Sequence, residues 1–298
     1  MILVTGANGF IGKHLLTHLI CLYGKQHIVA LTSKPIESCA YVLHDNYQFD
    51  AGIFIKNGFA QIDTIIHAGA FIPKKANEVN DLALCNSNIY NTQKLIEANL
   101  PNLRKFIFLS TVDVYGHSDI ILENSLEKPV SLYGYSKLYG EKMIEEWGKT
   151  NSKIIQNLRV GHVYGPGEET YQKIIPVSFN KLLTNQPLQI WGSGQELRAF
   201  IYVNDIVKAI VKSIALEEHI GVVNLVSEQS ISVKNLVYKI KKLSSSDVPV
   251  ETISTDNTGR NLVFDNSKMK KWLLNKEKTL DSGLQEEFDY MKMLSLEQ

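Results

Sequence analysis

The 298-residue chain has 31 Lys and Arg residues against 31 Asp and Glu residues, so its formal net charge at pH 7 is zero. This balance gives no strong field for a nucleic-acid backbone or an anionic membrane, and we expect neither as a partner. The three cysteines form no Cys-x-x-Cys motif, which favours a reducing, cytoplasmic setting over a disulfide framework. A strand-like run begins at residue 2 with no signal peptide before it, and no apolar run reaches the ~18 residues of a membrane span.

The first half of the chain alternates short apolar runs with longer helical patterns. We expect strands at 2–5, 27–32, 64–67, 106–110 and 154–159, and helices near 12–22, 81–98 and 131–147. This alternation predicts an α/β fold, a Rossmann-type doubly wound parallel sheet. Beyond residue 165 the loops lengthen, so we expect a dinucleotide-binding domain at 1–160 and a smaller C-terminal α/β substrate lobe at 161–298. One strand near 222–226 is expected to return to the sheet.

A glycine-rich loop joins the first strand to the first helix. Glycine lets the backbone turn tightly and approach a pyrophosphate closely, and a helix N-terminus offers N–H groups to that anion. Because the loop lies at the strand–helix junction, it predicts dinucleotide binding. Its expected cofactor-binding residues are Gly6, Asn8, Gly9, Phe10, Ile11 and Gly12.

The end of the second strand bears on the choice between NAD and NADP. An acid at this point would bind a ribose 2′-hydroxyl and repel a 2′-phosphate. The chain has Thr32, Ser33 and Lys34 instead, two hydroxyls and a cation, which favours NADP. An ordinary polar loop, with NAD as the cofactor, is the alternative.

Three Tyr-x-x-x-Lys pairs occur in the chain, and one of them follows a strand that ends in hydroxyl residues. Tyr133 and Lys137 have the spacing that puts two side chains on one helix face, and Thr111 lies upstream at the end of the expected strand 106–110. A tyrosine needs its pKa of about 10 lowered to act as an acid/base near neutrality, and a neighbouring ammonium lowers it while burial opposes. We therefore expect Tyr133, Lys137 and Thr111 to be catalytic.

These motifs resemble the extended short-chain dehydrogenase/reductase family, in particular its NAD-dependent epimerase/dehydratase group, over nearly the whole chain. The resemblance implies an oxidoreductase that acts on a nucleotide-diphosphate sugar. It also implies that helices 81–98 and 131–147 form the four-helix interface of a homodimer. Further cofactor residues implied by the resemblance are Asp50 at the adenine, then Ala68, Gly69, Ala70 and Asn88; the implied substrate residues are His162, Arg198 and Arg260.

The reaction itself is left open by the motifs. Asp113 stands where sugar dehydratases and some 4-keto reductases of the resembled family carry an acid, so we count it as catalytic. Val112 stands where the better known dehydratases carry a second acid. We expect a 4-keto sugar nucleotide reductase that uses NADPH. The alternative is a 4-epimerase with retained NAD, and a sugar dehydratase or a non-catalytic dinucleotide sensor ranks below both. No metal site is expected.

Overall fold

A seven-stranded parallel sheet forms the centre of the molecule in the computed structural model, which describes residues 1–255 and 259–296. The strand order β10-β6-β5-β4-β1-β2-β3 places the first strand inside the sheet, with the chain winding outward to both sides of it. This is the expected Rossmann-type doubly wound α/β fold. The strands are β1 (Ile2–Thr5), β2 (Ile28–Thr32), β3 (Ala40–Leu43), β4 (Thr64–His67), β5 (Lys105–Thr111), β6 (Ile154–Val160) and β10 (Val223–Leu225).

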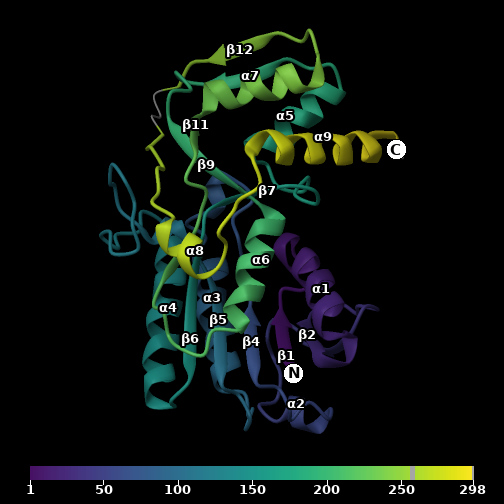
Figure 1. The fold of residues 1–298 in the computed structure, drawn as a ribbon, viewed down its shortest axis with the longest axis vertical. Helices are drawn as coiled ribbons and strands as arrows, with labels where there is room; N and C mark the ends of the chain where they lie inside the picture. The colour runs from purple at the N-terminus through teal and green to yellow at the C-terminus, as the bar shows by residue number, and fades with distance from the viewer. Residues whose placement is uncertain (256–258, 297–298) are drawn as a thin grey trace.

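Two helical layers cover the two faces of this sheet (Figure 1). Helices α3 (Leu82–Ile96) and α4 (Leu132–Thr150) pack together on one face, and α1 (Phe10–Tyr23) packs with α6 (Val203–Ile214) on the other. Strand β5 serves both layers, because Phe106 and Phe108 belong to the core beneath α3 and α4, while Ile107 and Leu109 belong to the core beneath α1 and α6. Full burial on both sides explains the continuous apolar runs in the sequence. The short helix α2 (Ile53–Lys56) lies at the amino-terminal end of the strands (Figure 1).

The second part of the chain builds a smaller α/β region above the carboxyl end of the sheet (Figure 1). A three-stranded sheet joins β11 (Ser230–Ser232), β9 (Leu197–Tyr202) and β7 (His162–Tyr164), and a parallel pair joins β12 (Val250–Ile253) to β8 (Leu188–Trp191). The helices here are α5 (Ile174–Leu183), α7 (Val233–Ser244), α8 (Ser267–Trp272) and α9 (Leu280–Leu296). Strand β10 returns from this region and pairs with β6, at the place expected for residues 222–226.

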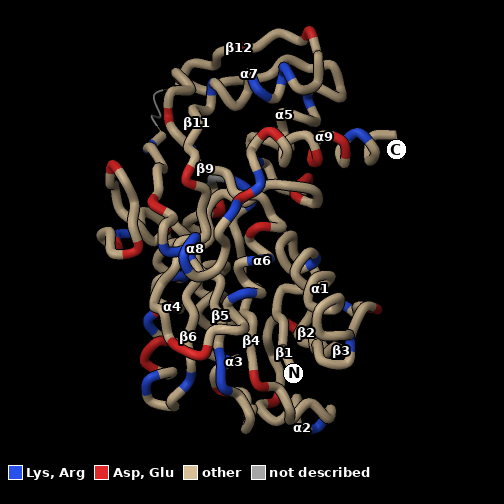
Figure 2. Tube along the Cα trace, in the orientation of Figure 1, with Lys and Arg blue, Asp and Glu red and all other residues tan. Residues whose placement is uncertain are grey.

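Lys and Arg residues are interspersed with Asp and Glu residues in both regions (Figure 2). No helix within residues 1–255 and 259–296 is long and apolar enough to cross a membrane. Across the same ranges, no group of three or more His, Cys, Asp or Glu side chains is arranged to hold a metal ion.

Candidate active site

The glycine loop lies between β1 and α1, against the chain that follows β4. Gly6 has a φ of +70°, and a Cβ on it would lie 2.6 Å from the backbone nitrogen of Gly69. A Cβ on Gly12 would lie 1.9 Å from the carbonyl oxygen of Gly6, so no larger residue fits either position. The loop, the start of α1 and the segment Ala68–Ala70 therefore form a backbone cradle at the carboxyl edge of the sheet. This shape fits a dinucleotide pyrophosphate.

Side chains beneath the cradle hold its two halves together. The Thr5 hydroxyl accepts a hydrogen bond from the Gly69 N–H (2.8 Å) and also bonds Nδ1 of His67 (2.7 Å), whose Nε2 bonds the Thr92 hydroxyl (3.1 Å). Burial, and then the charge of Lys137, lower the pKa of His67 well below its usual value. His67 is thus a neutral structural residue, with both ring nitrogens engaged. Asn88 likewise fastens the chain after β4 to α4, because its amide bonds both backbone groups of Phe71 and the Ser136 hydroxyl.

The residues expected to contact the adenosine ribose lie at the carboxyl end of β2. The Thr32 hydroxyl accepts a hydrogen bond from the Asn8 amide (2.9 Å) and donates to the carbonyl of Lys34 (2.9 Å), so it is engaged within the loop. Ser33 and Lys34 are exposed.

Asp50 does not lie with these residues. Its side chain is 62% exposed at the start of α2, where it bonds Nζ of Lys56 (3.0 Å) and the Gly52 N–H (2.8 Å), toward the opposite edge of the sheet. The expectation that Asp50 approaches the adenine ring disagrees with this placement, because the chain turns back at Asn46 and Tyr47, both with positive φ. Asp45, which follows β3 within two residues, is the acid at the carboxyl edge of the sheet, and it was missed because β3 itself was not expected.

The three expected catalytic residues converge where β5 meets α4. Ser131 caps α4 through the Gly134 N–H, so that Tyr133 and Lys137 lie in the first two turns of the helix, and both are buried. The Thr111 hydroxyl, at the end of β5, acts on Tyr133 and lowers its pKa. Nζ of Lys137 lies 4.2 Å from the ring centre of Phe108. The structure thus places Thr111, Tyr133 and Lys137 at the junction of β5 and α4, and their catalytic role stays a prediction.

The electrostatics of the cluster differ from the expectation. Burial first, and then the charge of Asp113, raise the pKa of Tyr133, while Thr111 lowers it less. The pKa of Tyr133 thus lies above its usual value in this arrangement, because burial is the largest cause. Burial also lowers the pKa of Lys137 to about 7, against the opposing charge of Glu141. Tyr133 is therefore held as a phenol that can donate its proton.

Asp113 lies beside this cluster, in the 3₁₀ turn η3 (Val112–Val114) that follows β5. The Thr111 hydroxyl bonds its carboxylate (3.3 Å), and Nη2 of Arg260 lies 3.6 Å from it. Burial raises the pKa of Asp113, although Arg260 and Thr111 oppose this. The side chain remains 46% exposed, so it can reach a ligand in front of Tyr133.

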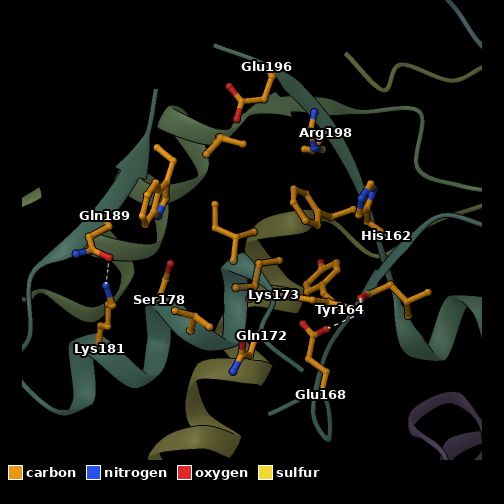
Figure 3. A pocket seen from close by; sticks show the side chains of 17 residues that line it. His162, Tyr164, Glu168, Gln172, Lys173, Ser178, Lys181, Gln189, Glu196 and Arg198 are labelled. Carbon is orange, nitrogen blue, oxygen red and sulfur yellow. Dashed lines mark hydrogen bonds and ion pairs between the residues drawn. The ribbon is translucent and has the colours of Figure 1, made fainter. Parts of the chain in front are cut away.

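A cavity of about 440 Å³ opens between β7, β8, β9 and α5 and holds two of the expected substrate residues (Figure 3). Figure 3 shows Arg198 and His162 on one side of the cavity, and Lys181 with Gln189 on the other. Nη1 of Arg198 donates to the carbonyls of Leu197 (2.9 Å) and Arg260 (2.6 Å). Arg260 itself donates to the carbonyl of Tyr115 (2.8 Å), outside the cavity lining.

His162 lies at the start of β7 as a neutral ring. Burial, followed by the charges of Arg198, Lys173 and Arg260, lowers its pKa to about 3. Its buried Nδ1 has no hydrogen-bond partner among the described side chains and backbone. A neutral imidazole with a free nitrogen at the cavity wall can bind an uncharged or anionic oxygen of a ligand.

The sequence reasoning missed a set of cavity residues on the loop after β7. Lys173 bonds Glu168 (3.2 Å) and the carbonyl of Val163 (3.1 Å), and the charge of Glu168 acts on the buried Glu287 of α9. Burial first, and then the charge of Glu168, raise the pKa of Glu287. Contacts between segments more than 100 residues apart leave no local signal. The ring centre of Tyr171 lies 4.9 Å from Nζ of Lys173.

Comparisons with known proteins agree with this architecture. Over 98% of both chains, the sequence is 30% identical to an uncharacterized UDP-glucose epimerase of Bacillus subtilis. It is 28% identical to a trifunctional UDP-glucose 4,6-dehydratase/3,5-epimerase/reductase of Arabidopsis thaliana, over 97% of this chain but only 46% of that protein. The chain spans about half to two thirds of the length of the first curated relatives it matches.

Among solved structures, a UDP-glucuronic acid 4-epimerase of Bacillus cereus, in complex with UDP-glucuronic acid and NAD, superposes with a TM-score of 0.86 at 26% identity. The match covers 98% of this chain and 99% of that one. The family model for the NAD dependent epimerase/dehydratase family matches residues 2–225. On this match and on the cradle, catalytic cluster and fold described above, the chain belongs to the NAD dependent epimerase/dehydratase family.

Proposed function

We propose that the protein is a 4-epimerase of a nucleotide-diphosphate sugar that retains NAD through the reaction cycle. The observation that carries the proposal is the Thr111–Tyr133–Lys137 cluster beside the glycine cradle at the carboxyl edge of the sheet. A catalytically silent dinucleotide sensor would have no need to keep all three side chains together. The similarity to a 4-epimerase that binds NAD supports this reaction over the reductase that we expected from the sequence.

The residues of the cluster have distinct roles in the proposed reaction. Tyr133 gives its proton to, or takes it from, the oxygen on C4 of the sugar, and Thr111 holds that oxygen by a hydrogen bond. Lys137 supplies a positive charge that stabilises Tyr133 when it has lost the proton. A nicotinamide dinucleotide, held by the glycine loop and the segment Ala68–Ala70, would supply the hydride acceptor and donor for C4. An epimer results when the sugar presents its other face as the hydride returns.

The cofactor is proposed to be NAD rather than the NADP that Thr32, Ser33 and Lys34 favour. The similar epimerase structure contains NAD. In this chain, the Thr32 hydroxyl is engaged by Asn8 and by its own loop. Epimerisation consumes no hydride, so it gains nothing from a cofactor that cells keep reduced.

The nucleotide-diphosphate sugar is proposed to lie across the two regions, with its sugar before Tyr133 and its nucleotide in the cavity. Arg198 and Arg260 are the proposed contacts of the diphosphate, since planar guanidinium groups bind phosphate oxygens bidentately. His162, with its free Nδ1, is a proposed contact of the diphosphate or the sugar. This arrangement also supports the division into a dinucleotide-binding domain at 1–160 and a substrate lobe at 161–298.

We also propose that the protein forms a homodimer through α3 and α4. Large apolar and aromatic side chains of these helices are exposed, including Leu82 (65%), Tyr135 (53%) and Tyr139 (57%). They line a groove of about 410 Å³ between the helices. A second copy packed on this face would bury them in a four-helix bundle.

The test is to incubate the purified protein with UDP-glucose, UDP-glucuronic acid and dTDP-glucose, and to follow the sugars by NMR while cofactor absorbance is recorded. We expect one C4 epimer pair to interconvert with no net change in NADH. In Tyr133→Phe, turnover should fall at least about 100-fold. Stoichiometric loss of NADPH with a 4-keto sugar nucleotide would establish the reductase instead, and a product lighter by one water would establish a dehydratase.

A further inference from the structure

A buried carboxylate lies one helical turn after Lys137, outside the catalytic cluster. Glu141 is on the same face of α4 as Tyr133 and Lys137, because residues four apart align along a helix. Its side chain is fully buried, as is that of Arg159 on β6. A buried carboxylate is stable only when it is paired, so its partner determines where its charge lies.

Arg159 fixes that position through several hydrogen bonds. Its Nε donates to both oxygens of Glu141 (3.0 and 3.2 Å), and its Nη2 donates to one of them (2.6 Å). The guanidinium lies 4.7 Å from the ring centre of Tyr115. Its Nη2 also donates to Glu127, an acid that is partly exposed and bonded to Lys142. Arg159 thus holds two carboxylates, of which Glu141 alone lies on the catalytic helix.

The geometry brings Lys137 close to the strand below it. A Cβ on Gly140 would lie 2.8 Å from Cζ of Phe108, so the glycine lets α4 approach β5. The Phe108 ring then lies beneath Nζ of Lys137, at 4.2 Å. An aromatic face attracts a cation but cannot replace the water that burial removes. The ammonium therefore depends on a nearby negative charge.

We propose that Glu141, held by Arg159, is a positioning residue for the Tyr133–Lys137 pair: its carboxylate favours the ammonium form of the buried Lys137 side chain. Glu141 is the negative charge that acts on Lys137, whereas Tyr133 on the same helix is an uncharged phenol and His67 on β4 has its own pKa lowered by the Lys137 charge. Burial brings the pKa of Lys137 down to about 7, and Glu141 counteracts this. The role of Lys137 in turnover rests on the proposed function. The charge state of the Lys137 side chain can be tested independently of that function.

The experiment measures that charge state directly. The ¹³Cε resonance of Lys137, assigned by its loss in Lys137→Arg, is titrated between pH 5 and pH 10 in the protein freed of bound nucleotide. We expect Glu141→Gln to lower the pKa of Lys137 by at least about one unit, a tenfold change in the ratio of its two forms. The matched control is Glu127→Gln, which removes the other carboxylate on Arg159 and should leave this pKa within about 0.3 unit.

A second variant guards against misfolding. Glu141→Gln leaves Arg159 with one carboxylate, so the double variant Glu141→Gln/Arg159→Gln replaces the buried ion pair by two amides that can bond each other. The double variant should still lower the pKa of Lys137, because the Glu141 carboxylate on α4 lies nearer to Lys137 than the Arg159 guanidinium does. An unchanged pKa in both variants, or an equal change in Glu127→Gln, would overturn the proposal.

Turnover gives the second readout. With the proposed epimerase reaction, Glu141→Gln should move the alkaline limb of the pH profile to lower pH by the same amount, and Glu141→Asp should restore it. If no epimerase activity is found at all, the NMR titration still decides the proposal. A pKa that shifts without any change in the pH profile would show that Glu141 does not act on catalysis.

Discussion

Replacing Lys137 by methionine should abolish turnover and yet stabilise the protein. The unfolded chain holds this amine with an ordinary pKa of 10.5, while burial lowers it to about 7 in the folded protein. At about 1.36 kcal/mol for each pKa unit, the folded state loses about 5 kcal/mol at low pH by carrying the charge. Methionine keeps most of the volume but gives up the contact of the ammonium with Phe108, worth about 2 kcal/mol. The net gain is about 3 kcal/mol.

The pH dependence distinguishes this cause from improved packing. Between pH 7 and 10.5 the unfolded state binds a proton that folded Lys137 has released, so the stability of the unsubstituted protein rises with pH in this window. The advantage of Lys137→Met should therefore be full below pH 7 and vanish toward pH 10.5. Urea unfolding of the nucleotide-free protein at pH 6, 8 and 10 measures it.

The matched control is Lys94→Met, since Lys94 follows Tyr90 at the same spacing on α3 but has a partly exposed side chain paired with Glu97. It should change the free energy of unfolding by less than about 0.5 kcal/mol at every pH. The reasoning is refuted if Lys137→Met is less stable than the unsubstituted protein at pH 6, or if its advantage is the same at pH 6 and 10.

Three further outcomes follow from the geometry of the site. Gly134→Ala should lower turnover at least about tenfold and destabilise the protein by about 1–3 kcal/mol, because its Cβ would lie 2.6 Å from the carbonyl oxygen of Asp113; steady-state kinetics and urea unfolding measure both. Arg198→Ala should raise the KM for the nucleotide sugar by roughly 10- to 100-fold, the loss of one charge-assisted contact, and an unchanged KM removes it from the diphosphate site. Tyr139→Glu should yield monomers in light scattering, whereas Tyr238→Glu, at a similarly exposed site on α7, should not; a monomeric unsubstituted protein would reject the dimer.

The sequence was sufficient to predict site residues that belong to short local motifs. The glycine loop, the strand ending at Thr111 and the Tyr133–Lys137 spacing are local, and the fold brings them to one edge of the sheet. Strand β3 was missed because its apolar run is only four residues long and lies at the exposed edge of the sheet, where only Val42 is buried. Asp50 lies away from the cofactor edge because the chain reverses at Asn46 and Tyr47, and a tyrosine gives no indication of a positive φ.

The pKa of Tyr133 shows a second limit of the sequence. The spacing identifies an ammonium that could lower this pKa. The pKa also depends on the burial of Tyr133, which the packing of α4 against β5 determines, and on the charge of Asp113. These are long-range properties. The Arg159–Glu141 pair is of the same kind, since 18 residues separate its members and only the packing of α4 on β6 brings them together.

The neighbourhood of Asp113 bears on which reaction follows hydride removal. Elimination of water needs an acid and a base at adjacent carbons. Asp113 is half exposed beside Tyr133 and Arg260, and it can serve as one of them. The preceding side chain, Val112, is apolar and buried in a cluster with Val114 and Tyr115, so this turn supplies no second carboxylate. With one acid and a neighbouring guanidinium, the site is better suited to hold an intermediate ketone until its reduction than to remove a proton and a hydroxyl from the sugar. This supports the proposed return of the hydride to C4, which needs no second carboxylate.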